Sequence, residues 1–169
     1  GTANWLDQTT GSYSYGTGAV VFNSSGTQTA YSPNQFGTIE VRNAGLSLNS
    51  TIQSQNWLLH TGVVTTGINL GIALSTAQLA VNATAANPNY TNSWFNGTLR
   101  RYIVPTTINS YVFPVGNSVR VNRAELDNLM ATPLNASYID ASFIPMPGTD
   151  AGLFLPSSSD RILYNSIPN

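Results

Sequence analysis

Apolar and polar side chains alternate in short segments along almost the whole chain. Residues 38–42 place an apolar side chain at every second position, and residues 68–74 repeat the pattern. Alternation with a period of two, interrupted every few residues by Gly, Asn, Ser or Pro, is the signature of β-strands. Residues 123–130 are the one stretch compatible with a helix, and they are short and contain Asn. The pattern predicts an all-β protein.

The strands predicted between residues 18 and 80 recur at an almost constant spacing. Phe22 and Val41 are 19 residues apart, and Val41 and Leu59 are 18 apart. A repeat near twenty residues that holds two or three short strands is typical of a parallel β-solenoid, whose apolar side chains stack inward from coil to coil. A β-sandwich remains the alternative, because it also uses short strands and polar turns. Hairpin dipeptides are scarce, however, with Asn96-Gly97 the sole Asn-Gly.

The chain divides into three regions, which could still form one continuous domain. Residues 1–17 are expected to be an extended arm, 18–80 to be solenoid-like, and 81–169 to form a capping or sandwich-like sheet with longer strands. Asp7 is the only charged residue of the arm. We hypothesise that the arm adds to a sheet edge, of its own chain or of a neighbouring subunit, with Trp5 as its anchor, and we favour the neighbouring subunit. The alternative is that the arm is a linker.

Composition narrows the range of functions. Only 8 % of the residues are charged, against about 25 % in an average domain, and the net charge is −1 with no lysine. Six arginines cannot form a nucleic-acid surface. Ser, Thr and Asn make up about a third of the chain, which is typical of secreted or cell-surface material. The apolar runs are too short to span a membrane, and without cysteine there is no disulfide or thiolate site.

Groups suited to catalysis are few. His60 is the only histidine, and no Gly-x-Ser-x-Gly nucleophile motif accompanies it. The only glutamates are Glu40 and Glu125. We expect Glu40 to lie outward beside Arg42, and Glu125, with Asp127, to pair with Arg123 on the surface. These residues indicate a protein that is not an enzyme.

Metal binding has little support in the sequence. Asp140, Asp150 and Asp160 are spaced ten residues apart in Gly-, Pro- and Ser-rich surroundings, but no Asp-x-Asp-x-Asp-Gly loop occurs. We therefore predict neither a metal nor a cofactor.

Two polar features stand out from the composition. Aromatic residues in polar settings are candidates for exposed rings that stack on sugars or mediate assembly. The alternative is that Trp94, like Trp57, belongs to the core and that the N-terminal tyrosines cover a sheet edge or a solenoid end. Six Asn-x-Ser/Thr sequons are candidate glycosylation sites, although a chain this rich in these residues contains several by chance. The aromatic candidates are Trp5, Tyr13, Tyr15, Tyr31, Tyr90 and Trp94, and the sequons begin at Asn23, Asn49, Asn82, Asn89, Asn96 and Asn135.

Two sequence motifs in the second half of the chain, called phrases below, resemble motifs of a known group of proteins. Residues 94–101 read Trp-Phe-Asn-Gly-Thr-Leu-Arg-Arg, and residues 110–116 read Ser-Tyr-Val-Phe-Pro-Val-Gly. Together with the preceding repeats, they resemble modules of large exported surface proteins of Bacteroidota, from about residue 16 to residue 145. Within the phrases, Asn96-Gly97 predicts a tight turn and Pro114 the end of a strand. Arg100 and Arg101 should point to opposite faces, one paired with a carboxylate or carbonyl groups and the other solvated.

The resemblance implies export across the outer membrane, often by the type IX secretion route, and a role in adhesins, filaments or enzyme scaffolds. We therefore expect a non-enzymatic structural module of a cell-surface adhesin or filament. Its partners would be further copies of the chain or neighbouring modules of a larger protein. The alternative is a carbohydrate-binding module of a secreted polysaccharide-degrading protein, with glycans as partners.

Overall fold

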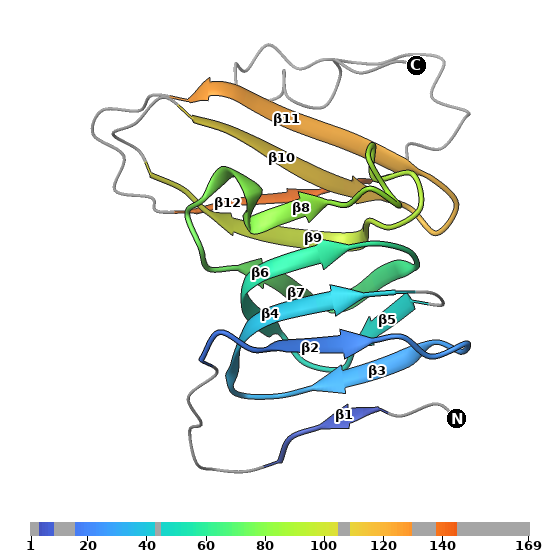
Figure 1. Ribbon diagram of the computed structural model, residues 1–169. Coiled ribbons are helices and arrows are strands. Elements are labelled where there is room, and N and C mark those ends of the chain that lie inside the picture. Colours follow the sequence, from blue (N-terminus) through green and yellow to red (C-terminus); the bar gives the residue numbers. More distant parts are fainter. Residues whose placement is uncertain (1–3, 9–15, 43–44, 105–108, 130–137, 145–169) are drawn as a thin grey trace.

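The described part of the protein consists mostly of β-strands, with almost no helix (Figure 1). The computed structural model describes residues 4–8, 16–42, 45–104, 109–129 and 138–144. The all-β prediction is confirmed, and the stretch considered as a possible helix falls largely in strand β11. Among the described residues the only helical element is η1, a 3₁₀ turn. The elements are β1 (Trp5–Leu6), β2 (Ala19–Phe22), β3 (Gln28–Tyr31), β4 (Gln35–Val41), β5 (Gly45–Leu48), β6 (Ile52–Leu59), β7 (Val63–Ala73), η1 (Gln78–Ala80), β8 (Val81–Ala83), β9 (Phe95–Tyr102), β10 (Asn109–Gly116), β11 (Val121–Leu129) and β12 (Tyr138–Ser142).

Strands β1 to β9 pair in parallel with the strand two places along the chain. One row runs β1-β3-β5-β7-β9 and the other β2-β4-β6-β8, as Figure 1 shows from bottom to top. In β3–β5, β4–β6 and β5–β7, partner residues are 18 positions apart, for example Val41 with Leu59. The spacing predicted from the sequence therefore recurs as the register of the parallel pairs.

The long strand β7 connects the two rows. Its first residues, Val63–Thr65, pair with β5, and its last, Gly71–Ala73, pair with β6. Strand β9 pairs in parallel with both of these parts of β7, and the register of the pairing shifts between Thr65 and Leu70. At this shift Gly67 has a φ of +59°, and Ile68 is fully exposed. The irregularity lets one continuous strand bend from the first row into the second.

The core is formed by apolar side chains stacked in register across the rows. Ile39, Trp57 and Val81 occupy paired positions of β4, β6 and β8, and all three are buried. The Trp57 indole N–H donates to the Ile72 carbonyl at 3.0 Å, and its ring meets Phe95 edge-on at 5.1 Å. Burial of each large apolar side chain contributes about 1.5–3 kcal/mol. These stacked side chains stabilise the fold through contacts between successive strands of a row, which we call rungs.

The C-terminal strands extend this core with mixed pairing. β10 pairs antiparallel with β11 and, over two residues, parallel with β9, while β12 pairs antiparallel with β9. Phe113 and Val115 of β10 belong to the same buried cluster as Phe22 of β2. One apolar core therefore runs through strands from both the 18–80 and the 81–169 regions.

Two predictions about turn residues are wrong. Asn96 and Gly97 lie inside β9, and Pro114 lies inside β10. A Cβ at Gly97 would stand 1.9 Å from the Thr66 hydroxyl, and the φ of Gly97 is +128°. The glycine is needed because β9 approaches β7 closely there. Pro114 is accommodated because the short pairing of β10 with β9 begins only at Val115.

The N-terminal segment pairs with a sheet edge of its own chain. Trp5 lies opposite Ala30 in the β1–β3 pair, and the Asn4 side chain accepts a hydrogen bond from the Thr29 amide at 2.9 Å. The Asp7 carboxylate accepts a hydrogen bond from the Ser32 hydroxyl, also at 2.9 Å. The expected strand addition is thus present within the chain, rather than on a neighbouring subunit as favoured from the sequence.

Candidate functional site

Two of the aromatic candidates are buried rather than exposed. Tyr90 and Trp94 are each only 6 % exposed, so neither offers an exposed ring, and for Trp94 the alternative of a place in the core is confirmed. The Trp94 indole N–H donates to the Asn117 carbonyl at 2.8 Å, and the Tyr90 hydroxyl donates to the Val81 carbonyl at 3.0 Å. Both polar groups are satisfied inside the protein, so these rings serve packing and offer no face to a sugar.

The segment that buries these rings is held by one amide side chain. Asn87 is buried, and its Nδ2 donates to the carbonyls of Leu59 and Ser93, each at 3.0 Å. Its Oδ1 accepts from the Asn92 amide at 2.8 Å. This role of Asn87 was not predictable from the sequence, because Asn-Pro-Asn-Tyr-Thr-Asn has the composition of an exposed loop.

The remaining aromatic candidates lie near the N-terminal end of the fold. Trp5 is half-buried and packs edge-on against Phe36 at 5.5 Å. Tyr31 is exposed on β3. Tyr13 and Tyr15 lie outside the described residues.

Two of the ion pairs expected on the surface are present. The Arg42 Nε donates to Glu40 at 3.0 Å, and Arg123 pairs with Glu125. The Nε2 atom of His60 lies 3.6 Å from the Glu40 carboxylate, and this distance is too long for a hydrogen bond. Within the described segments no three His, Cys, Asp or Glu side chains gather at a metal-binding distance.

Arg100 and Arg101 point to opposite faces, and both have partners. Arg100 makes two hydrogen bonds of 2.7 Å to the Asp140 carboxylate and lies over the Tyr138 ring. Arg101 is fully buried, and its guanidinium donates to the carbonyls of Ala77, Gln78 and Val112. Burial lowers the pKa of Arg101 to about 10. Arg101 is therefore the arginine bound by carbonyls, as predicted for one of the two, whereas Arg100 lies at the surface in a partly exposed ion pair instead of being free in solvent.

The sequons differ in accessibility. Asn23, Asn49 and Asn89 are exposed, whereas Asn82 and Asn96 are half-buried. Asn135 lies outside the described residues. The three exposed asparagines are the better candidates for modification.

The first candidate interaction surface is the edge of β2. This strand pairs with β4 on one side and, among the described residues, with no strand on the other. It reads Ala-Val-Val-Phe and carries no charge, and Val21 points outward with 41 % of its surface exposed. At the other end of the fold, β11 bears the exposed Arg123, Glu125 and Asp127. Charges of this kind discourage pairing at a strand edge, and β2 lacks them.

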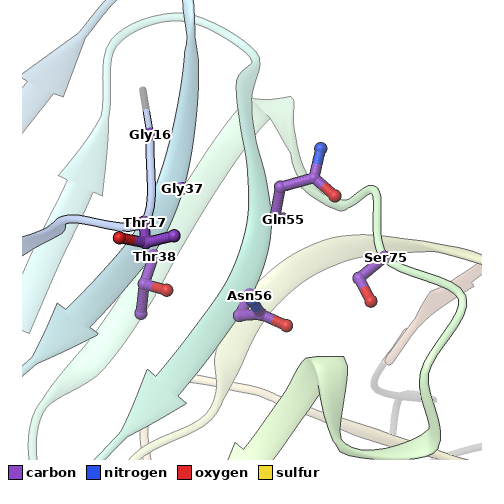
Figure 2. Close-up of a pocket in the computed structure, with 7 residues that line it drawn as sticks. All are labelled: Gly16, Thr17, Gly37, Thr38, Gln55, Asn56 and Ser75. Carbon is purple, nitrogen blue, oxygen red and sulfur yellow. The ribbon is translucent and has the colours of Figure 1, made fainter. Parts of the chain in front are cut away.

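The second candidate surface is a polar hollow beside β4 and β6 (Figure 2). It has a volume of about 330 Å³ and contains no charged residue. Thr38 of β4 and Asn56 of β6 are partners in the parallel pair, so they come from neighbouring rungs. Sequence reasoning missed the hollow, because its residues adjoin only through that pairing. Its lining residues are Gly16, Thr17, Gly37, Thr38, Gln55, Asn56 and Ser75.

Comparison with known proteins gives no relative: no family model, curated protein or solved structure matches the chain. No helix in the described segments has the length and apolar character needed to cross a membrane. Any statement about function therefore rests on the geometry of these two surfaces.

Proposed function

We propose that the chain is a non-enzymatic structural module of an exported surface protein, which assembles through the open edge of β2. In this proposal β1 to β9 form a short β-solenoid, and β10 to β12 close one end of it. Support for the solenoid interpretation comes from the 18-residue register and from the inward stacking of apolar side chains. The proposed location, secreted or on the cell surface, is supported by the composition alone.

The observation that carries the proposal is the contrast between the two ends. Among the described residues β2 pairs on one side only, and it exposes Val21 without a charge, a proline or a bulge, whereas β11 carries exposed charges. Main-chain hydrogen bonds to an open edge supply affinity in strand addition, and alternate side chains set the register. We propose that a second copy of the chain, or a neighbouring module, occupies this edge. The low net charge gives little electrostatic repulsion between copies.

The proposal predicts that a charge on β2 weakens self-association. Val21→Lys places an ammonium group at the edge, where pairing would remove it from water, so we expect the association constant to fall at least tenfold. Sedimentation velocity over a range of protein concentrations measures this constant.

Val119→Lys is the matched control, because Val119 is 80 % exposed and lies between β10 and β11, away from the β2 edge. It should associate like the wild type. A wild type that stays monomeric at every concentration, or an equal loss in both variants, contradicts the proposal.

A further inference from the structure

We propose that the polar hollow beside β4 and β6 binds a neutral, hydroxyl-rich ligand, namely an extended segment of a polysaccharide. The hollow borders the start of β2, where Thr38 pairs with Ala19, but this inference does not depend on self-association, because it uses the side chains of Thr38 and Asn56 and not the outer backbone edge of β2. It also differs from the aromatic site expected from the sequence, since Tyr90 and Trp94 are buried.

The chemistry of the lining selects the class of ligand. All seven residues are uncharged, and five of them carry a hydroxyl or an amide, groups that both donate and accept hydrogen bonds. Phosphate or carboxylate ligands are usually held by Arg or Lys, which the lining lacks. An apolar ligand would need hydrophobic walls, and the only side chains here are those of Thr, Gln, Asn and Ser. A neutral polyol fits this lining best.

Several polar groups in the hollow remain available to a ligand. Within the described part of the chain, the side chains of Thr17, Thr38 and Asn56 make no hydrogen bond. On the other side of β6, Ser75 continues the pairing of the end of β7, and its amide donates to the Gln55 carbonyl at 3.2 Å. In Figure 2 the Asn56 side chain lies between those of Thr38 and Ser75. Three neighbouring segments of the sheet thus each contribute a polar group.

The spacing of these groups suits a repeating ligand. Neighbouring strands lie about 4.8 Å apart, close to the length of one hexose unit in an extended chain. A glycan running across the strands would therefore present one sugar to each rung. With a volume of about 330 Å³, the hollow is at the small end of ligand sites, which suits two or three sugar units.

The test is titration of the full chain with neutral hexasaccharides of β-1,4-glucose, β-1,3-glucose, β-1,4-xylose and β-1,4-mannose. Isothermal calorimetry gives the affinity, and the NMR signal of the Asn56 side-chain amide reports contact at the hollow. The double variant Thr38→Val/Asn56→Leu keeps the number and branching of the side-chain heavy atoms but removes their hydrogen-bonding groups. We expect at least one hexasaccharide to bind, and the double variant to bind it about tenfold more weakly.

The control is Thr29→Val/Asn82→Leu, the same two replacements on β3 and β8 outside the hollow. It should bind like the wild type, and urea unfolding should show that both double variants are folded. The proposal is overturned if no hexasaccharide gives saturable binding. It is equally overturned if binding leaves the Asn56 signal and the affinity of the Thr38/Asn56 variant unchanged. Neither result bears on self-association through β2.

Discussion

At the scale of single residues, Tyr90 shows how a loop becomes part of the core. It adopts a φ of +60°, the only positive value for a non-glycine residue in the described segments. Such a conformation is uncommon for a bulky side chain and persists only where the surroundings enforce it. Here the enforcing contacts are the hydroxyl bond to Val81 and the Asn87 amide that organises the loop. The strain is balanced by burying a large ring.

This burial makes stability depend on pH. Loss of solvent raises the pKa of the Tyr90 hydroxyl. In the unfolded chain a tyrosine ionises near pH 10, whereas the folded protein retains the proton. Above about pH 10 the unfolded state then binds fewer protons, so the free energy of unfolding falls as pH rises. We expect the stability advantage of the wild type over Tyr90→Phe to shrink between about pH 8 and pH 11.

Urea unfolding at a series of pH values measures this difference. Tyr31→Phe is the control, because it removes a tyrosine hydroxyl from an exposed ring. A wild-type advantage over Tyr90→Phe that stays constant across this range would show that the buried hydroxyl does not couple folding to protons.

At the scale of elements, Arg101 links β9 to two neighbouring segments, η1 and β10. It occupies the last position in a series of paired residues that runs across four strands. Phe36, Ser54, Ala73 and Arg101 occupy paired positions of β4, β6, β7 and β9. From the last of these positions the guanidinium reaches carbonyls next to and within η1 and the Val112 carbonyl of β10. A planar group with five donors can serve three acceptors at once. Arg101 therefore joins β9 to η1 and to β10.

The adjacent arginines allow a matched test of this role. We expect Arg101→Lys to lower the free energy of unfolding by about 2 kcal/mol, because a buried ammonium cannot reach all three carbonyls. Arg100→Lys should cost less than about 1 kcal/mol, because its ion pair with Asp140 is partly exposed. Chemical denaturation of both variants measures the two costs. Equal costs would mean that the network of Arg101 does not hold these elements together.

The strands themselves could be predicted from the sequence, but several contacts between them could not. Alternation and spacing predicted the strands between residues 18 and 80, because each rung buries its side chains in the same way. The contacts of Gly97 and Arg101 were not predictable, since their partners lie in other strands and turns: Thr66 is 31 residues from Gly97, and Ala77 and Val112 are 24 and 11 residues from Arg101. The burial of Tyr90 was missed for the same reason, because local composition describes neighbours in sequence and not in space.

At the scale of the whole molecule, the buried cluster crosses the boundary expected near residue 80. Leu59 of β6 and Val115 of β10 belong to one apolar core. A shared core couples the stability of its parts, so strands on both sides should unfold together. We expect Leu59→Ala, which costs about 3 kcal/mol, to reduce amide protection in β10 as much as in β4.

Hydrogen exchange under native conditions measures protection strand by strand. Leu79→Ala is the control, because it makes the same change at a largely exposed position. If Leu59→Ala leaves β10 fully protected, the two regions fold as separate units.

Partner residues in β3–β5, β4–β6 and β5–β7 are separated by only 18 positions, so each of these pairs closes a short loop. The entropic cost of closure rises with loop length, and chains emerge from the ribosome with the N-terminus first. Each strand can thus dock as soon as its own segment has been synthesised, without waiting for distant parts of the chain. Every docked strand exposes a new edge, which the next segment then covers. Growth in this direction leaves β1 and β2, the first strands of the two rows, as edges that no later strand of these rows covers.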